Sequence, residues 1–159
     1  MNKKILRLAI PNIISNITIP LVGMVDLAIL GHLESEIYIG AIAIGGLIFN
    51  VLYWGFGFLR MGTSGFTAQA YGKRDFSEVT ALLGRALIVA LGGAAFLIIM
   101  NGPIGWLSFK VINGSQEVEA LAREYYNIRI FAAPATIGLY ALTGWFIGMQ
   151  NTRFPMIIA

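Results

Sequence analysis

The chain alternates between long apolar stretches and short polar connections. Three stretches carry no charged residue: 37–59, 86–109 and 130–152. A fourth, from Leu8 to Leu33, carries a single charge at Asp26. A helix that crosses a bilayer needs about 20 mostly apolar residues. The pattern therefore predicts an all-α, polytopic membrane protein with four transmembrane helices, over about residues 6–31, 37–71, 79–101 and 119–150.

Local signals at the connections agree with these spans. Asp75-Phe76-Ser77-Glu78 has the form of a capping box, with an N-cap acceptor followed three residues later by a carboxylate. Asn113-Gly114-Ser115 reads as a turn, and Glu117 and Glu119 then fall in the first turn of a helix. The mixed segment 117–129 is expected to be an interfacial extension of the fourth helix.

The composition narrows the class of protein. Of the 159 residues, 57% are hydrophobic and 12% are charged, whereas soluble domains carry about a quarter charged residues. This balance excludes a soluble enzyme and a disordered chain. The sequence has no cysteine, and it contains no nucleophile–base pair, phosphate loop or metal-ligand spacing. We therefore expect a protein that is not an enzyme and that uses no cofactor.

The basic residues lie mostly on one side of the four predicted spans, which orients the chain. That side holds Lys3, Lys4, Arg7, Lys73, Arg74, Arg85 and Arg153, and the other holds Lys110, Arg123 and Arg129. By the positive-inside rule the N-terminus is cytoplasmic. The same rule accounts for the net positive charge without nucleic acid. The first span is long and holds two prolines, so an uncleaved helix is favoured over a signal peptide.

Asp26 is the strongest candidate for a functional residue. A carboxylate within a spanning helix costs roughly 2.5–3.5 kcal/mol on insertion scales and is a functional candidate by default. Two interpretations stay open: an interfacial acid that reaches the headgroups, or a buried carboxylate. A buried Asp26 could exchange a proton or hold a cation such as Na⁺, which a coupling site in an antiporter requires.

A polar stripe accompanies Asp26 along the first helix. At 100° per residue, Asn12 and Ser15 fall on the same face as Asp26. The stripe indicates either a water-filled cavity or hydrogen bonding between helices. Pro11 and Pro20 permit a bend beside it.

Three further features concern the other helices. Arg60 is a second charge within a span, for which we favour a structural role, paired with a carboxylate or with helix-end carbonyls or reaching an interface. Gly144 and Gly148 have the small-xxx-small spacing of close helix packing. The aromatic residues, among them Tyr53 and Trp54, suit interfacial belts or a cavity wall.

Several segments, in order along the chain, resemble motifs of the multidrug and toxic compound extrusion (MATE) family. In the first helix they are Ala9-Ile10-Pro11, Ser15-Asn16, Val25-Asp26 and Gly31-His32-Leu33. Later segments are Thr67-Ala68-Gln69-Ala70-Tyr71-Gly72 with Asp75, and Gly148-Met149-Gln150-Asn151-Thr152-Arg153 with Pro155. Leu59-Arg60-Met61-Gly62-Thr63 is similar to the DinF-like bacterial branch.

The resemblance implies an antiporter that exports organic, often cationic, compounds in exchange for H⁺ or Na⁺. Such proteins have twelve helices in two lobes, and this chain matches the first four helices of the N-terminal lobe. The family's acidic site carries over to Asp26, and Pro11 fits a bend proposed to accompany protonation. Arg60, Gln69, Gly72 and Gln150 match structural motif positions.

The length implies that residues 1–159 are a partial lobe, with 154–159 starting a truncated fifth helix. The expected partners are then an export substrate, the lipid bilayer, and the missing later helices and second lobe. The expected location is the bacterial inner membrane. Two alternatives remain: a complete four-helix exporter acting as a dimer, and a non-transporting membrane scaffold.

Overall fold

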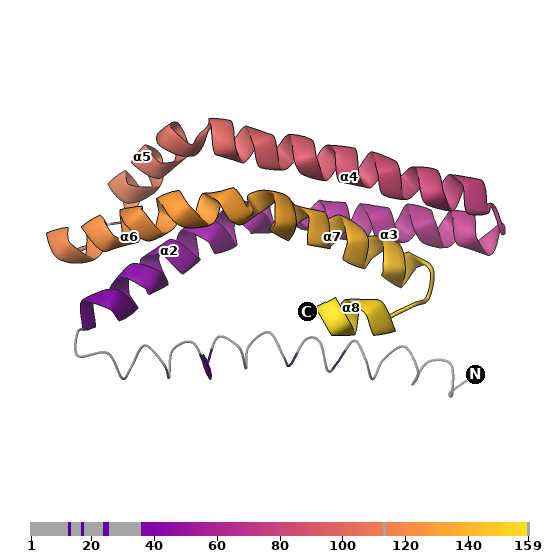
Figure 1. The fold of residues 1–159 in the computed structure, drawn as a ribbon, viewed down its shortest axis with the longest axis horizontal. Helices are drawn as coiled ribbons and strands as arrows, with labels where there is room; N and C mark the ends of the chain where they lie inside the picture. Colours follow the sequence, from indigo (N-terminus) through magenta and orange to yellow (C-terminus); the bar gives the residue numbers. More distant parts are fainter. Residues whose placement is uncertain (1–12, 14–16, 18–23, 26–35, 113, 159) are drawn as a thin grey trace.

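The computed structural model describes residues 13, 17, 24, 25, 36–112 and 114–158. In this part of the chain every regular element is a helix, which confirms the expected all-α class (Figure 1). The helices, numbered as in Figure 1, are α2 (Glu36–Trp54), α3 (Gly57–Gly72), α4 (Phe76–Ile99), α5 (Asn101–Val111), α6 (Gln116–Arg129), α7 (Ala133–Gly148) and α8 (Arg153–Ile158), with a 3₁₀ turn at Ile130–Ala132 between α6 and α7.

Three stretches of the described chain are long and apolar enough to cross a bilayer: residues 37–72, 76–99 and 116–148. The chain is therefore a multi-pass helical membrane protein. The span expected over 6–31 lies outside the described residues apart from positions 13, 17, 24 and 25.

The stretch 37–72 is two helices rather than the single helix expected from hydropathy. α2 ends at Trp54 and α3 begins at Gly57, and the Phe56 amide donates to the Tyr53 carbonyl at 2.9 Å in a tight turn. Gly55 and Gly57 flank this turn. Glycine costs about 1 kcal/mol relative to alanine in a helix interior, so these two glycines favour a break in the helix here.

A proline explains the 3₁₀ turn in the stretch 116–148. Pro134 has no amide proton and cannot donate to the carbonyl of Ile130, four residues earlier. The Ala133 amide donates to that carbonyl instead, and this shorter bond tightens the helix locally into a 3₁₀ turn. α7 thus follows α6 without a loop, through one 3₁₀ turn.

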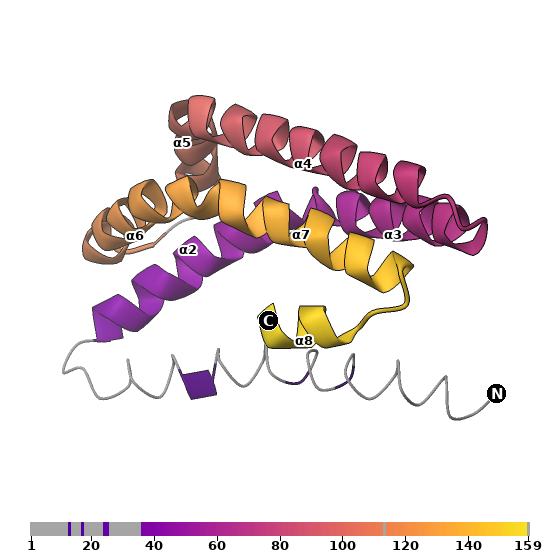
Figure 2. The same cartoon turned by 45° about the vertical axis from the view of Figure 1, so that its right-hand side comes forward.

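α5 adds a helix to the four predicted spans. The charge-free run that begins in α4 continues to Phe109, but α4 ends at Ile99 and α5 starts at Asn101. Pro103 has no amide proton and cannot donate to the carbonyl of Ile99, so the hydrogen-bond pattern of α4 cannot continue through it. The result is the change of direction between α4 and α5 in Figures 1 and 2.

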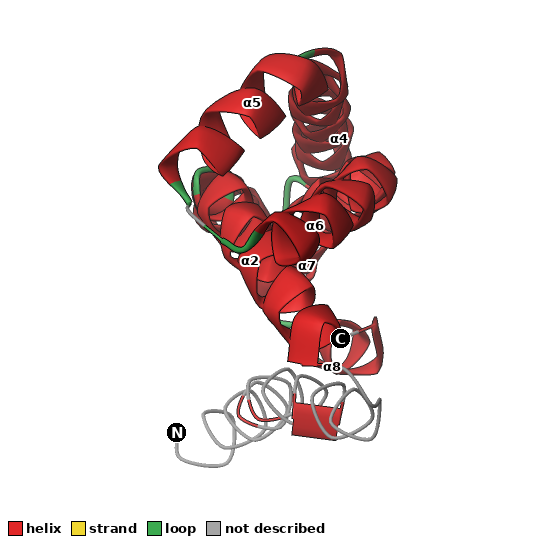
Figure 3. Cartoon of the chain, turned by 90° about the vertical axis from the view of Figure 1, so that its left-hand side faces the viewer, coloured by secondary structure: helices red, strands yellow, loops and turns green. Residues whose placement is uncertain are grey.

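The helices form two packed groups. α3, α4 and α7 contact one another, with α3 and α7 running in the same direction and α4 running against them (Figures 1 and 2). α2 packs along α6, and α5 contacts both α4 and α6, as the end-on view in Figure 3 shows. α8 folds back beneath α7.

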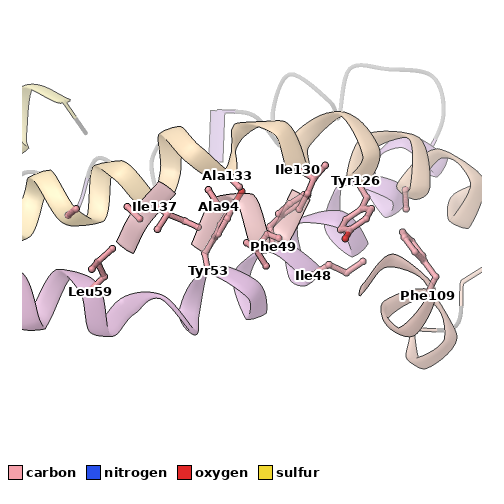
Figure 4. Close-up of a cluster of buried hydrophobic side chains, with 14 of the residues drawn as sticks. Ile48, Phe49, Tyr53, Leu59, Ala94, Phe109, Tyr126, Ile130, Ala133 and Ile137 are labelled. Atoms are coloured by element: carbon pink, nitrogen blue, oxygen red, sulfur yellow. The ribbon is translucent and has the colours of Figure 1, made fainter. Parts of the chain in front are cut away.

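The core joins the two groups along the inner faces of α2, α6 and α7. The large side chains buried there are Phe49, Tyr126, Ile130 and Ile137. They lie beside the face of α4 that carries small residues such as Ala94 (Figure 4). Large apolar side chains elsewhere are exposed, including Ile88 and Phe96 of α4. An apolar exterior is expected where a helix meets lipid rather than water.

Candidate functional site

A groove of about 720 Å³ opens where the end of α2, the first turns of α3 and one face of α7 meet. Its walls are largely apolar and aromatic, with two polar side chains from α3. They are formed by Tyr53, Trp54, Gly57, Phe58, Arg60, Met61, Ser64, Tyr140 and Ile147. Small-molecule sites have this size and this mixture of apolar walls with a few polar groups.

Arg60 is the charged residue of the groove, and it is half-buried. Among the described residues, none forms a hydrogen bond or ion pair with its guanidinium, and no acidic residue lines the groove. Arg85 and Arg123, in contrast, pair with Glu78 at 2.7 Å and Glu119 at 2.8 Å. The described chain thus offers Arg60 no paired carboxylate or carbonyl, and its predicted structural role stays a prediction.

Two glycines of α7 hold the backbone of α3 close to α7. A Cβ atom built on Gly144 would lie 2.5 Å from the Arg60 carbonyl oxygen. A Cβ on Gly148 would lie 2.6 Å from the Cβ of Thr67 and 2.7 Å from the Ser64 carbonyl oxygen. All three distances are too short for real contacts, so this glycine seam, Gly144 and Gly148 against α3, requires glycine. The seam sets where Arg60 lies relative to α7.

Aromatic packing positions the α2 side of the groove. Phe49 stacks on Tyr53 with ring centroids 5.5 Å apart and on Tyr126 with centroids 5.4 Å apart. The Tyr53 hydroxyl is buried and forms no hydrogen bond of normal geometry within the described part of the chain. Trp54, the next residue, is 86% exposed and stands at the groove wall. The structure thus places Tyr53 and Trp54 in the wall of a cavity.

The motif residues Gln69 and Gly72 lie at the end of α3. The Gln69 carbonyl accepts a bond from the Lys73 amide at 3.2 Å, and its side chain is exposed. Gly72 is the last residue of α3, and a Cβ there would meet nothing within 4 Å. Nothing in the structure explains a requirement for glycine at position 72.

Gln150 belongs to a helix end that repeats the end of α3. After α7, the Gln150 amide donates to Ile147 and the Asn151 amide to Phe146, both at 2.9 Å. After α3, Arg74 and Asp75 donate in the same way, at 3.0 Å each. These are Schellman motifs, and in both the residue with φ of 60° is not glycine but Arg74 or Gln150.

The remaining candidates of the first helix lie outside the described residues. These are Asp26, Asn12, Ser15, Pro11 and Pro20, and their proposed roles stay predictions. Within the described residues, no group of histidine or acidic side chains could hold a metal ion.

Sequence reasoning missed the groove itself, although it named several of its members. Phe58, Met61 and Ser64 line the groove together with Arg60, and of these three Ser64, four residues further on, shares the helical face of Arg60. Ser64 is the sequence feature that could have predicted the groove, since a hydroxyl four residues after a charge on a spanning helix marks a polar face of that helix. Tyr140 joins from α7, far away in sequence.

Comparisons with known proteins agree with this architecture. The MatE family model matches residues 11–159. The chain is 40% identical over 157 residues to "DNA damage-inducible protein F" of Escherichia coli K12, covering 99% of this chain and 34% of the relative. It is 24% identical over 159 residues to "Probable multidrug resistance protein NorM" of Thermotoga maritima, with coverage of 99% and 34%.

A plant protein is related as well. "Protein DETOXIFICATION 47, chloroplastic" of Arabidopsis thaliana is 26% identical over 140 residues, covering 86% of this chain and 25% of the relative. No solved structure matches the chain. The chain spans about a third of the length of the first two curated relatives. Since the family model covers nearly the whole chain, the protein belongs to the MatE family.

Proposed function

We propose that the chain is part of a secondary active antiporter that exports organic compounds in exchange for H⁺ or Na⁺. The observation that carries the proposal is the family match over residues 11–159, which includes Asp26. The printed names of two relatives, a probable multidrug resistance protein and a DETOXIFICATION protein, support export as the activity. The proposal makes the protein a transporter rather than an enzyme.

The chain forms a partial N-terminal lobe in this proposal. Its support is that the chain spans 34% of two relatives while almost all of it is aligned. The groove at α2, α3 and α7 would then face further helices of the same transporter or its substrate path. Sequencing the gene beyond codon 159 tests this: an open frame supports it, and an adjacent stop codon contradicts it.

We further propose that the chain lies in the bacterial inner membrane with its N-terminus in the cytoplasm. The short connections after α3 and α7 lie at one end of the described helices in Figure 1; the first carries Lys73 and Arg74, and Arg153 begins α8 directly after the second. Cytoplasmic connections are rich in such residues. Membrane-impermeant maleimide should therefore label Ser115→Cys but not Ser77→Cys in spheroplasts of cells expressing otherwise cysteine-free full-length protein. Labelling of Ser77→Cys alone contradicts this orientation.

Replacing the coupling carboxylate tests the export function. In the full-length gene product, Asp26→Asn should abolish gradient-driven efflux of a cationic dye such as ethidium, while membrane insertion stays intact. Asp75→Asn is the matched control: Asp75 is an exposed carboxylate whose side chain accepts the Glu78 amide at 3.0 Å, and asparagine caps a helix equally well. Normal efflux by Asp26→Asn would exclude Asp26 as the coupling site.

A further inference from the structure

We infer that the groove beside Arg60 binds an organic anion, with the acid group on the Arg60 guanidinium and a flat apolar body between the aromatic walls. This inference rests on the proposed export function and names a substrate class for it. The ligand of this groove is an aromatic carboxylate or sulfonate of drug size, a second class of export substrate beside the organic cations that an ethidium assay probes.

The charge of Arg60 is the first step. The described arginines other than Arg60 fall into two groups. Arg85, Arg123 and Arg129 have partners, and Arg74 and Arg153 are exposed at helix ends. Arg60 is half-buried within a spanning stretch and has no such partner in the described chain. A guanidinium stays protonated in proteins and seeks a carboxylate, sulfonate or phosphate.

The depth of Arg60 strengthens its attraction for an anion. Arg60 lies thirteen residues before Lys73, or about 20 Å along the helix axis at 1.5 Å per residue. Given a hydrocarbon core of about 30 Å, it therefore lies far from the end marked by Lys73 and Arg74. Charge pairs are stronger in such a low-dielectric setting than at a surface.

The walls of the groove suit the rest of the ligand. Trp54, Phe58 and Tyr140 supply flat rings, and Met61 supplies an adaptable side chain. A volume of about 720 Å³ accommodates a drug-sized molecule. No carboxylate of the described chain lines this groove to attract a cation. The charge and the walls together favour an amphipathic acid.

The glycine seam fixes the backbone from which the Arg60 side chain extends. The carbonyl of Arg60 lies where a Cβ on Gly144 would approach it to 2.5 Å, so α3 cannot slide along α7 without a clash elsewhere in the seam. A fixed backbone limits the geometries available to the guanidinium. Two parallel bonds from arginine to a carboxylate require this kind of positioning.

A matched pair of ligands tests the inference by direct binding, without any transport step. The probes are tritiated 1-pyrenebutyrate and its neutral amide, measured by scintillation proximity on the full-length protein in nanodiscs of zwitterionic lipid. The wild type should bind the acid at least tenfold more tightly than the amide. Arg60→Gln should weaken acid binding about tenfold to a hundredfold and leave amide binding within about twofold.

Three controls decide between the site and its alternatives. Arg85→Gln removes a paired surface charge and should leave both affinities unchanged. Trp54→Ala should weaken both probes to a similar extent, since it removes a wall rather than the charge. Arg60→Lys, which keeps the charge but loses the planar fork, should give an intermediate preference for the acid.

Four results would overturn the inference. The first is an acid-to-amide ratio that Arg60→Gln does not change, and the second is binding that Trp54→Ala leaves untouched. The third is a preference for the acid that appears only in the Asp26→Asn variant, because this would mean that the Asp26 carboxylate occupies Arg60 in the wild type. The fourth is complete loss of acid binding when phosphatidylglycerol is added to the nanodisc, which assigns the site to lipid headgroups. Loss of efflux with this binding pattern intact would instead contradict the export function.

Discussion

Two of the contacts between the described helices, α3 with α7 and α2 with α6, differ in which atoms touch. Between α3 and α7 the backbones meet through Gly144 and Gly148, and a Cβ at Gly144 would lie 2.5 Å from a carbonyl oxygen. Between α2 and α6 side chains meet instead, with Phe49 and Tyr126 stacked at 5.4 Å between ring centroids. Backbone contacts cannot relax by changing a rotamer, whereas ring contacts can. The seam is therefore expected to be rigid, and the aromatic contact is expected to adapt.

The largest expected effect comes from adding a methyl group to the seam. Gly144→Ala should destabilise the protein by about 2–3 kcal/mol, because α3 and α7 must separate to admit it. The control is Gly138→Ala on the same helix, where a Cβ meets nothing within 4 Å. That change should instead stabilise by about 0.5–1 kcal/mol through helix propensity. Thermal unfolding of the full-length protein in detergent measures both, and equal shifts would refute a rigid seam.

The same substitution in the aromatic contact should cost less. A Cβ on Gly45 would meet ring atoms of Tyr125, including Cε1 at 2.7 Å. Tyr125 is half-buried and can rotate away, so we expect Gly45→Ala to cost about 1 kcal/mol. The adjacent Gly46→Ala, with nothing within 4 Å of its Cβ, is the control in the same unfolding assay. A Gly45→Ala loss as large as that of Gly144→Ala would remove the distinction between the contacts.

The smallest effect is expected at the end of the seam. Gln150 adopts φ of 60° after α7, a conformation that costs a non-glycine residue roughly 1–2 kcal/mol. Gln150→Gly relieves this strain but increases the backbone entropy of the unfolded chain. The net result should be a gain of about 0.5 kcal/mol, seen as a small rise in melting temperature. A fall in melting temperature would show that the Gln150 side chain stabilises this turn.

The sequence predicts the features of this fold that depend on local chemistry. Runs without charge locate the three spans found in the described chain. The N-cap at Asp75 is confirmed, because its carboxylate accepts the Glu78 amide at 3.0 Å. The reciprocal bond of a capping box is not formed, since the Asp75 amide donates to the Ala70 carbonyl and the Glu78 carboxylate pairs with Arg85. The spacing of Gly144 and Gly148 indicates close packing, and the structure adds the partner, α3.

Features that depend on tertiary contact could not be predicted in this way. A local feature was missed as well: Pro103 redirects the chain into α5 within a run that hydropathy alone treats as continuous. The groove joins Trp54, Arg60 and Tyr140 from three helices, and no sequence spacing reveals that they meet. The lack of a partner for Arg60 among the residues that the structure describes is likewise a property of the packed helices.

Transport by the reconstituted full-length protein tests the central claim most directly. Proteoliposomes loaded with ethidium should release it when an inward proton or sodium gradient is imposed, and Asp26→Asn should abolish the gradient-dependent part. Release that depends on neither gradient, or that Asp26→Asn leaves unchanged, would contradict an antiporter coupled through Asp26.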